Sequence, residues 1–229
     1  MNSFASPQTL ATLPVRPSVD DLYSRVLEAI FEQRIHSASR FTEESLAQMF
    51  GARRSDMREV LMRLSHQHII LLRANHRPRV TEPDAEQTRQ TLHARRLAEI
   101  MLLRLAAQRA CAQDLKRLRT LVENERQCTE RGRAIRLSGE FHLQLAQMAG
   151  NAPLAHFLES LVPLTSLAIA HFDLQQKDYC AGQAHLEILD ALERGDAATA
   201  QIALNRHLDY LEDLLLSPAS ALGQNCAAG

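Results

Sequence analysis

Residues 41–70 read FTEESLAQMFGARRSDMREVLMRLSHQHII, two short amphipathic segments that are separated by Gly51. Thr42 is suited to cap a first helix, in which Glu43 and Glu44 would lie beside the positive end of the helix dipole. Gly51 permits a sharp turn because glycine has no Cβ. The apolar residues of the second segment recur three or four positions apart, and they are Met57, Val60, Leu61 and Leu64. This spacing predicts a helix-turn-helix unit.

A basic wing is expected directly after this unit. Two β-prone runs, 69–72 and 79–81, flank the turn-forming sequence NHRP at 75–78. Residues 51–80 contain seven arginines and two acidic residues, a local charge of +5 in a chain whose formal net charge is −1. A local excess of this kind favours contact with phosphates, because their neutralisation releases counterions. We expect the second helix to enter the DNA major groove and to present Arg54 and Arg58. The alternative is a solvated charged face.

The remainder of the 229-residue chain is long enough for a second domain with its own core. Its Leu-, Ala-, Arg- and Glu-rich composition predicts an antiparallel bundle of about six helices. The expected helices are 84–111, 113–131, 134–149, 152–175 with a kink at Pro163, 179–193 and 196–216. Pro83 is expected to end the wing and to occupy the first turn of the next helix. The predicted divisions are a disordered tail at 1–17, a DNA-binding domain at 18–82, the bundle at 83–216 and a second disordered tail at 217–229.

Several classes of protein are disfavoured by the sequence. The four cysteines have no C-x-x-C spacing, so neither a zinc ribbon nor a disulfide framework is supported. No signal peptide is visible, and we expect no apolar run long enough to cross a membrane. These features predict a cytoplasmic protein without a membrane partner. No H-E-x-x-H or nucleophile motif is found, so we expect no catalytic residues and no enzyme activity.

The sequence resembles a known family in both halves. LYSRVLEAIFEQRI (22–35), residues 41–64 and NHRPRV (75–80) resemble the winged helix-turn-helix of GntR-type bacterial transcription regulators. Residues 84–216 resemble the all-helical effector domain, called FCD, of the FadR branch. The resemblance implies a mostly α fold, with an N-terminal winged helix-turn-helix and a C-terminal all-α antiparallel bundle. It further implies that Arg54, Arg58 and Arg77 contact DNA, and Arg53 is an additional candidate.

Four positions in the DNA-binding half depart from the family pattern. Arg53 stands where the family often has Ser or Thr, Asp56 stands where Thr or Pro is usual, and His76 stands where the wing has a glycine. Glu44 occupies the position of a further DNA-contacting arginine, so that contact is not transferred.

Three histidines in the second half match the family positions that hold a divalent metal, and they are His142, His185 and His207. The family's fourth ligand is an aspartate one helical turn before the first histidine, where this chain has Ser138. A hydroxyl is a much poorer ligand for a divalent ion than a carboxylate. We therefore expect a weakened or absent site for Zn²⁺ or Ni²⁺, and no cofactor is certain. Without metal, the imidazoles and the Ser138 hydroxyl could hold an organic effector directly.

Arg95 matches the family position whose guanidinium meets the effector, a role suited to its planar fork of donors. The competing interpretation is an ion pair with Glu99, four residues further along the same helix. The expected effector is a small organic acid or a purine-like heterocycle.

As a whole, the resemblance implies a ligand-responsive transcription regulator, most often a repressor in this family, that controls a catabolic operon. A homodimer would bind a pseudo-palindromic operator in double-stranded DNA, because symmetric heads match symmetric half-sites. Two other functions stay open: a small histidine–metal enzyme, and a DNA-binding protein that responds to no effector.

Overall fold

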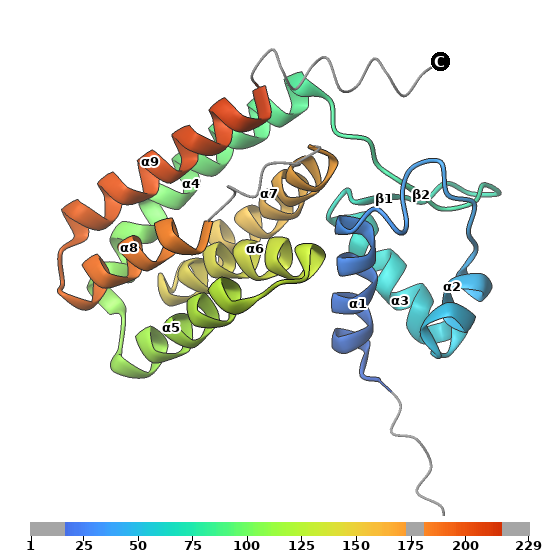
Figure 1. The fold of residues 1–229 in the computed structure, drawn as a ribbon, viewed down its shortest axis with the longest axis horizontal. Coiled ribbons are helices and arrows are strands. Elements are labelled where there is room, and N and C mark those ends of the chain that lie inside the picture. The colour runs from blue at the N-terminus through green and yellow to red at the C-terminus, as the bar shows by residue number, and fades with distance from the viewer. Residues whose placement is uncertain (1–16, 173–180, 217–229) are drawn as a thin grey trace, which may run out of the picture.

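The computed structural model describes residues 17–172 and 181–216. Within these ranges the chain forms nine helices and one two-stranded sheet, which are arranged as two lobes (Figure 1). The mostly α fold expected from the sequence is confirmed. The predicted tails, apart from Pro17, and the predicted helix ends at 175 and 179 lie outside the described residues.

The smaller lobe, here called the head, contains the helix-turn-helix. Its elements are α1 (Val19–Phe31), α2 (Glu43–Phe50), α3 (Arg54–His66), β1 (Ile70–Leu71) and β2 (Arg79–Val80). Thr42 caps α2 and forms a capping box with Ser45, and Gly51 turns the chain with a φ of +63°. The apolar face predicted for α3 is buried from Met57 to Leu64, whereas Met62 points outward and is 48% exposed.

The wing is an antiparallel pair in which Ile70 faces Val80 and Leu71 faces Arg79. Its turn contains Asn75, whose φ is +61°. Asparagine tolerates this left-handed conformation better than most residues. The wing therefore turns without a glycine at His76, which accounts for one departure from the family pattern.

The larger lobe is the helical bundle. It consists of α4 (Ala85–Arg109), α5 (Ala112–Gln127), α6 (Arg131–Met148), α7 (Ala152–His171), α8 (Ala181–Glu193) and α9 (Ala197–Leu216). Asp84 caps α4 by accepting hydrogen bonds from the N–H groups of Glu86 and Gln87. Pro83 precedes this cap, so the expectation that it lies in the first turn of the helix was wrong.

Helix α7 runs through the bundle and contains Pro163 in its interior. By length and composition this helix could cross a membrane, and half of its apolar window is buried among the other helices. The expectation that no segment meets this criterion was too strong. A core helix of a soluble bundle has the same properties, because a helix that is surrounded by others is apolar on most sides.

The head rests on the bundle through α1 and α6. Gly132, at the start of α6, approaches α1 so closely that a Cβ there would lie 2.4 Å from the Glu28 carbonyl oxygen. One turn further along, Arg136 pairs with the Glu28 carboxylate at 2.8 Å and is only 15% exposed. Helix α6 therefore forms part of the bundle core and also supports the head.

Candidate functional site

The first candidate site is the exposed face of α3. The side chains of Arg54 and Arg58 are 68% and 69% exposed. Both guanidinium groups lie near one carboxylate, since Glu43 is 3.3 Å from Arg54 Nε and 3.8 Å from Arg58 Nε. The sequence patterns did not single out Glu43 as a partner of the two arginines. Its contacts hold them side by side at the start of the helix.

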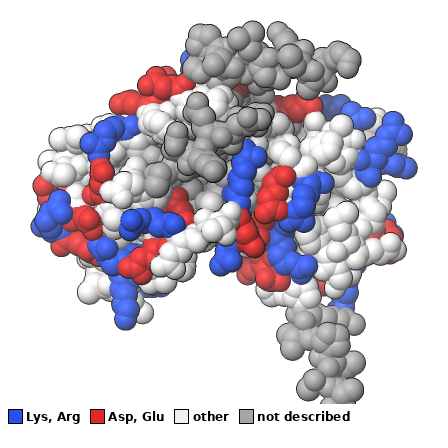
Figure 2. Space-filling model, in the orientation of Figure 1, with Lys and Arg blue, Asp and Glu red and all other residues white. Residues whose placement is uncertain are grey.

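Two further arginines complete the predicted DNA face. Arg53 precedes α3 as its N-cap residue and makes no capping hydrogen bond through its side chain. Arg77 is exposed in the wing, two residues after Asn75. Figure 2 shows basic side chains gathered at the edge of the molecule that carries the wing. The structure thus places all four predicted residues on exposed parts of the head.

The second candidate site is a cluster of three buried histidines in the bundle. His142 lies on α6, His185 on α8 and His207 on α9, and their exposed fractions are 2%, 0% and 3%. One potential ligand atom from each residue lies within 4.8 Å of those of the other two. The ring of Phe141 stacks on His185 with centroids 4.1 Å apart. The structure thus brings the three predicted histidines together.

Buried carboxylates orient two of the imidazoles. The Nδ1 of His142 lies 2.6 Å from Glu99, and the Nδ1 of His185 lies 2.7 Å from Glu125. When Nδ1–H donates to a carboxylate, the Nε2 lone pair of a neutral imidazole is free to bind another group. Glu125 had no signal in the sequence, because its partner is 60 residues away.

The two oriented Nε2 atoms, of His142 and His185, lie 3.3 Å apart. Two neutral imidazoles oriented in this way bring lone pairs together, which is unfavourable unless a proton or a cation lies between them. The Nε2 of His207 is buried and has no hydrogen-bond partner among the described residues. Three nitrogen donors with carboxylates behind two of them fit a divalent metal ion such as Zn²⁺.

The pKa values favour neutral imidazoles in this cluster. Burial lowers the pKa of His142 to about 4, although the Glu99 carboxylate acts in the opposite direction. Burial and the neighbouring imidazoles place the pKa of His207 well below its usual value. Burial would raise the pKa of Glu99, but Arg95 and His142 outweigh it and lower that pKa to about 2. Neutral histidines and an ionised carboxylate are the states that metal binding requires.

Arg95 lies beside this cluster and is 2% exposed. Its Nε donates to Glu99 at 2.6 Å, and its Nη1 donates to Thr165 at 2.5 Å. The ion pair considered in the sequence analysis is therefore present. The remaining Nη2 is buried without a partner in the described part of the chain. Arg95 thus keeps one donor that an additional group could use.

Ser138 is buried on α6, one turn before His142. Glu140 does not replace the expected aspartate, because it forms an ion pair with Arg136 instead. The only carboxylates in contact with the histidines among the described residues are Glu99 and Glu125, and both meet the Nδ1 side of a ring.

Comparisons with known proteins agree with both halves of this structure. The family profile described as FCD domain matches residues 90–210. Similar curated proteins include HTH-type transcriptional repressors NanR. That of Edwardsiella tarda is 27% identical over 91% of this chain and 94% of its own length. That of Cronobacter sakazakii is 27% identical over 73% of each protein.

Solved structures share the fold. Escherichia coli McbR/YncC is 18% identical and superposes with a TM-score of 0.70, over 86% of this chain and 96% of that chain. A GntR transcriptional regulator from Rhodococcus sp. RHA1 is 17% identical, with a TM-score of 0.70 over 87% of this chain and 98% of that chain. The FCD profile covers more than half of the chain. The chain therefore belongs to the GntR-type transcription regulators with an FCD domain.

Proposed function

We propose that this protein is a transcriptional repressor whose binding to operator DNA changes when a small metabolite binds in the helical bundle. The observation that carries the proposal is the exposed pair Arg54 and Arg58 at the start of α3, in a head that is supported directly by α6. Helix α6 also carries His142, so one helix joins the two candidate sites. Relatives named as repressors support the same function.

In the proposed DNA complex, α3 lies in the major groove and the wing lies along the backbone. Arg54 and Arg58 exchange their shared partner Glu43 for base edges or phosphates. This exchange costs little, because ion pairs between exposed side chains contribute at most about 1 kcal/mol. Arg77 reaches a phosphate from the wing, and Arg53 adds positive charge at the start of the recognition helix.

We propose that His142, His185 and His207 hold a divalent metal, Zn²⁺ or Ni²⁺, with lower affinity than a site that includes an aspartate. A bound ion would offer open coordination positions to an oxygen or nitrogen atom of the effector. Glu99 and Glu125 would hold two of the rings in place, as outer carboxylates do in many metal sites. Ser138 would contribute only a neutral hydroxyl.

Arg95 is the proposed contact for an acceptor atom of the effector. Its free Nη2 suits a carboxylate or carbonyl group, while Glu99 already balances its charge. Both an organic acid and a purine-like heterocycle carry such an acceptor. The histidines are closed to solvent, so an effector enters only if the helices move apart. Because the helices must move, effector binding can change the position of α6 and thereby of the head. The coupling free energy between an effector site and a second site is typically roughly 1–3 kcal/mol.

Two copies of the chain are proposed to pair through α4 and α9. These helices pack against each other, with Arg96 bonded to Asp209 and Arg104 to Gln201. They expose large apolar side chains that a second copy would cover, and these are Leu97, Met101, Ile202 and Tyr210. Sedimentation velocity on Leu97→Glu and Ile202→Glu tests this surface, because either variant should convert a dimer to a monomer.

The competing function is a small histidine–metal enzyme. Its support is the three-histidine cluster itself, which resembles the ligand set of catalytic zinc sites. The membership of the chain in a family of transcription regulators speaks against it. Two results together would favour the enzyme: the metal-loaded protein turns over a substrate, and it binds no DNA.

The test of DNA binding begins with selection of duplexes from a random pool by the full chain. We expect enrichment of a short pseudo-palindrome. Arg54→Ala and Arg58→Ala should each weaken binding to it by about 1–3 kcal/mol if they read base edges. Glu123→Gln, an exposed change on α5, serves as the control. A folded Arg54→Ala/Arg58→Ala variant with full affinity for the selected site would refute the proposed interface.

The metal is tested separately. Purified protein should carry less than one equivalent of Zn²⁺ or Ni²⁺, and Ser138→Asp should increase the bound amount by adding an anionic ligand one turn from His142. Mass spectrometric metal analysis of both proteins measures this. Full, chelator-resistant occupancy of the unmodified protein would show that three histidines suffice and that Ser138 does not weaken the site.

A further inference from the structure

A cavity of about 610 Å³ lies at the junction of the head and the bundle. We call it the junction cavity. Its lining comes from α1, α3, α5, α6 and α7, and none of the three clustered histidines is part of it. Its volume falls in the range of small-molecule sites in proteins. The proposed DNA face and the histidine cluster leave this space without a role.

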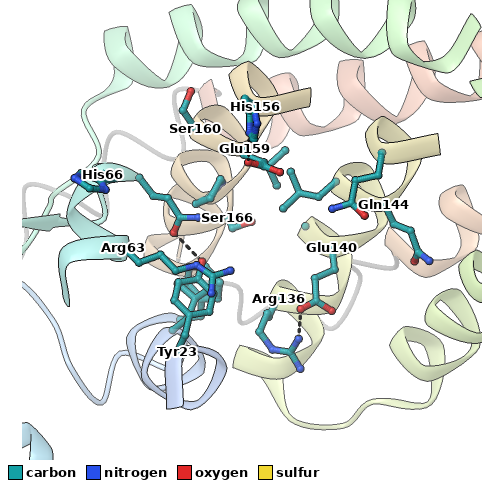
Figure 3. Close-up of a pocket in the computed structure, with 18 of the residues that line it drawn as sticks. Tyr23, Arg63, His66, Arg136, Glu140, Gln144, His156, Glu159, Ser160 and Ser166 are labelled. Atoms are coloured by element: carbon teal, nitrogen blue, oxygen red, sulfur yellow. Dashed lines mark hydrogen bonds and ion pairs between the residues drawn. The ribbon is translucent and has the colours of Figure 1, made fainter. Parts of the chain in front are cut away.

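The junction cavity has an apolar interior and a polar rim. The apolar lining residues are Leu27, Phe31, Leu121, Leu143, Val162 and Pro163. Figure 3 shows polar side chains arranged around the opening, with Tyr23 and Arg63 facing Glu140 and Gln144 across it. A ligand that fills this space therefore needs an apolar body and polar groups at its edge.

The two basic side chains of the rim are already engaged. Arg63 pairs with Asp20 at 2.8 Å, and its guanidinium stacks on Tyr23 at 3.8 Å from the ring centroid. Arg136 pairs with both Glu28 and Glu140. The Arg63–Asp20 pair is exposed and could be exchanged at little cost, whereas an anionic ligand at Arg136, which is only 15% exposed, would have to displace both Glu28 and Glu140. The more deeply placed arginine is thus neutralised within the protein and offers little attraction to negative charge.

Acceptor groups, by contrast, have capacity left. Glu159 accepts one hydrogen bond from His156 at 3.0 Å, and its side chain is 41% exposed. A carboxylate offers about four lone-pair sites, so such a group accepts further donors. The side-chain amides of Gln144 and Gln147 form no hydrogen bond with any residue in the described ranges. The Glu159 carboxylate and the two amide oxygens are thus available to hydroxyl and amino donors of a ligand, and the amide N–H groups are available to its acceptors.

We propose that the junction cavity binds a small phenolic amine, a ring compound with hydroxyl and ammonium donors and no negative charge. The ring would pack on Phe31, Leu143 and Val162, and the ammonium group would meet Glu159. Because α3 lines the cavity with Arg63, His66 and its C-cap residue Gln67, a bound ligand would fix the recognition helix relative to α6. This effect on DNA binding, unlike the site itself, rests on the proposed function.

Tyramine, with 4-hydroxyphenylacetate as its anionic counterpart, is the probe. Isothermal titration of the full chain without DNA should give saturable binding of one tyramine per chain and no comparable binding of the acid. Gln144→Trp fills the cavity, and Glu159→Gln removes a carboxylate. Each should weaken tyramine binding by about tenfold or more, an effect of the size expected for one lost charged contact. Glu123→Gln on α5, outside the cavity, should leave it unchanged.

Three outcomes would overturn the proposal. The first is the absence of saturable tyramine binding. The second is an unchanged affinity for tyramine in a Gln144→Trp protein whose melting curve is also unchanged. The third is that 4-hydroxyphenylacetate binds as tightly as tyramine and loses its binding in the same variants. The titrations contain no DNA, so their failure is distinct from a failure of operator binding. If tyramine binds, fluorescence anisotropy with the selected duplex then measures whether its occupancy alters DNA affinity.

Discussion

Replacement of Glu99 by glutamine tests the energetic role of the buried polar network behind the histidines. Glu99 is 1% exposed and Arg95 is 2% exposed, and the two bind at 2.6 Å. Glutamine preserves the shape and one acceptor but removes the negative charge. The guanidinium keeps its charge, because arginine is not deprotonated in proteins. A buried charge that loses its partner costs roughly 3–5 kcal/mol, and the remaining acceptor places the expected loss near the lower end, at about 3 kcal/mol.

Urea denaturation followed by circular dichroism at pH 7 measures this loss as a change in the free energy of unfolding. EDTA is included, because a bound metal would add its own stabilisation to the folded state. Glu123→Gln, the same change on an exposed part of α5, should alter stability by less than about 0.5 kcal/mol. Adding Arg95→Met to Glu99→Gln should recover most of the loss, because no unpaired charge then remains. A loss below about 1 kcal/mol in Glu99→Gln would show that solvent or another anion reaches Arg95.

The remaining predictions concern the head, the junction and the metal ligands. Gly132→Ala should reduce stability by about 1–3 kcal/mol, because a Cβ would lie 2.4 Å from the Glu28 carbonyl oxygen and the helices must separate; an unchanged thermal transition would contradict the close contact. Glu43→Gln should tighten DNA binding by up to about fivefold, because Arg54 and Arg58 lose an internal competitor worth at most about 1 kcal/mol; weaker binding in an anisotropy titration would mean that Glu43 positions the arginines instead. Arg77→Ala should weaken binding to all sequences and lower the slope of log affinity against log salt by about 1, which a titration at several KCl concentrations measures; loss of sequence preference would assign Arg77 to a base. His207→Ala should weaken Zn²⁺ binding by more than about 100-fold, since loss of even an outer partner of a metal ligand weakens metal affinity 10- to 100-fold. Competition with a chromophoric chelator measures this affinity, and an unchanged value would place the ion elsewhere.

The fold of this protein was predictable wherever local chemistry determines it. Thr42, Gly51 and the apolar spacing from Met57 to Leu64 define the helix-turn-helix within a short local segment, and the structure has the elements in that order. The pattern that predicts the wing is equally local. The one difference is that Asn75 adopts the left-handed conformation in the turn, whereas the family has a glycine at the next position. Patterns of this kind depend on backbone preferences and periodicity, which act over a few residues.

The surroundings of the candidate site were less predictable, because they depend on tertiary contacts. The histidines were identified from their positions in the family pattern, whereas Glu125 meets His185 across 60 residues of sequence and carried no signal. Arg95 has one partner of each kind. Glu99 lies four residues further along the same helix and could be foreseen, whereas Thr165 lies 70 residues away and could not. The junction cavity needs five helices in place and has no counterpart in any short motif.

Two faces of helix α6 contact different parts of the protein, and this arrangement constrains how the protein evolves. One face carries Ser138 and His142 in the bundle core, and the other carries Gly132 and Arg136 against the head. A substitution that adapts the core face to a new ligand is acceptable only if the backbone stays where Gly132 meets α1. Effector preference is therefore expected to diverge more readily through α8 and α9, which make no extensive contact with the head within the described residues, than through α6.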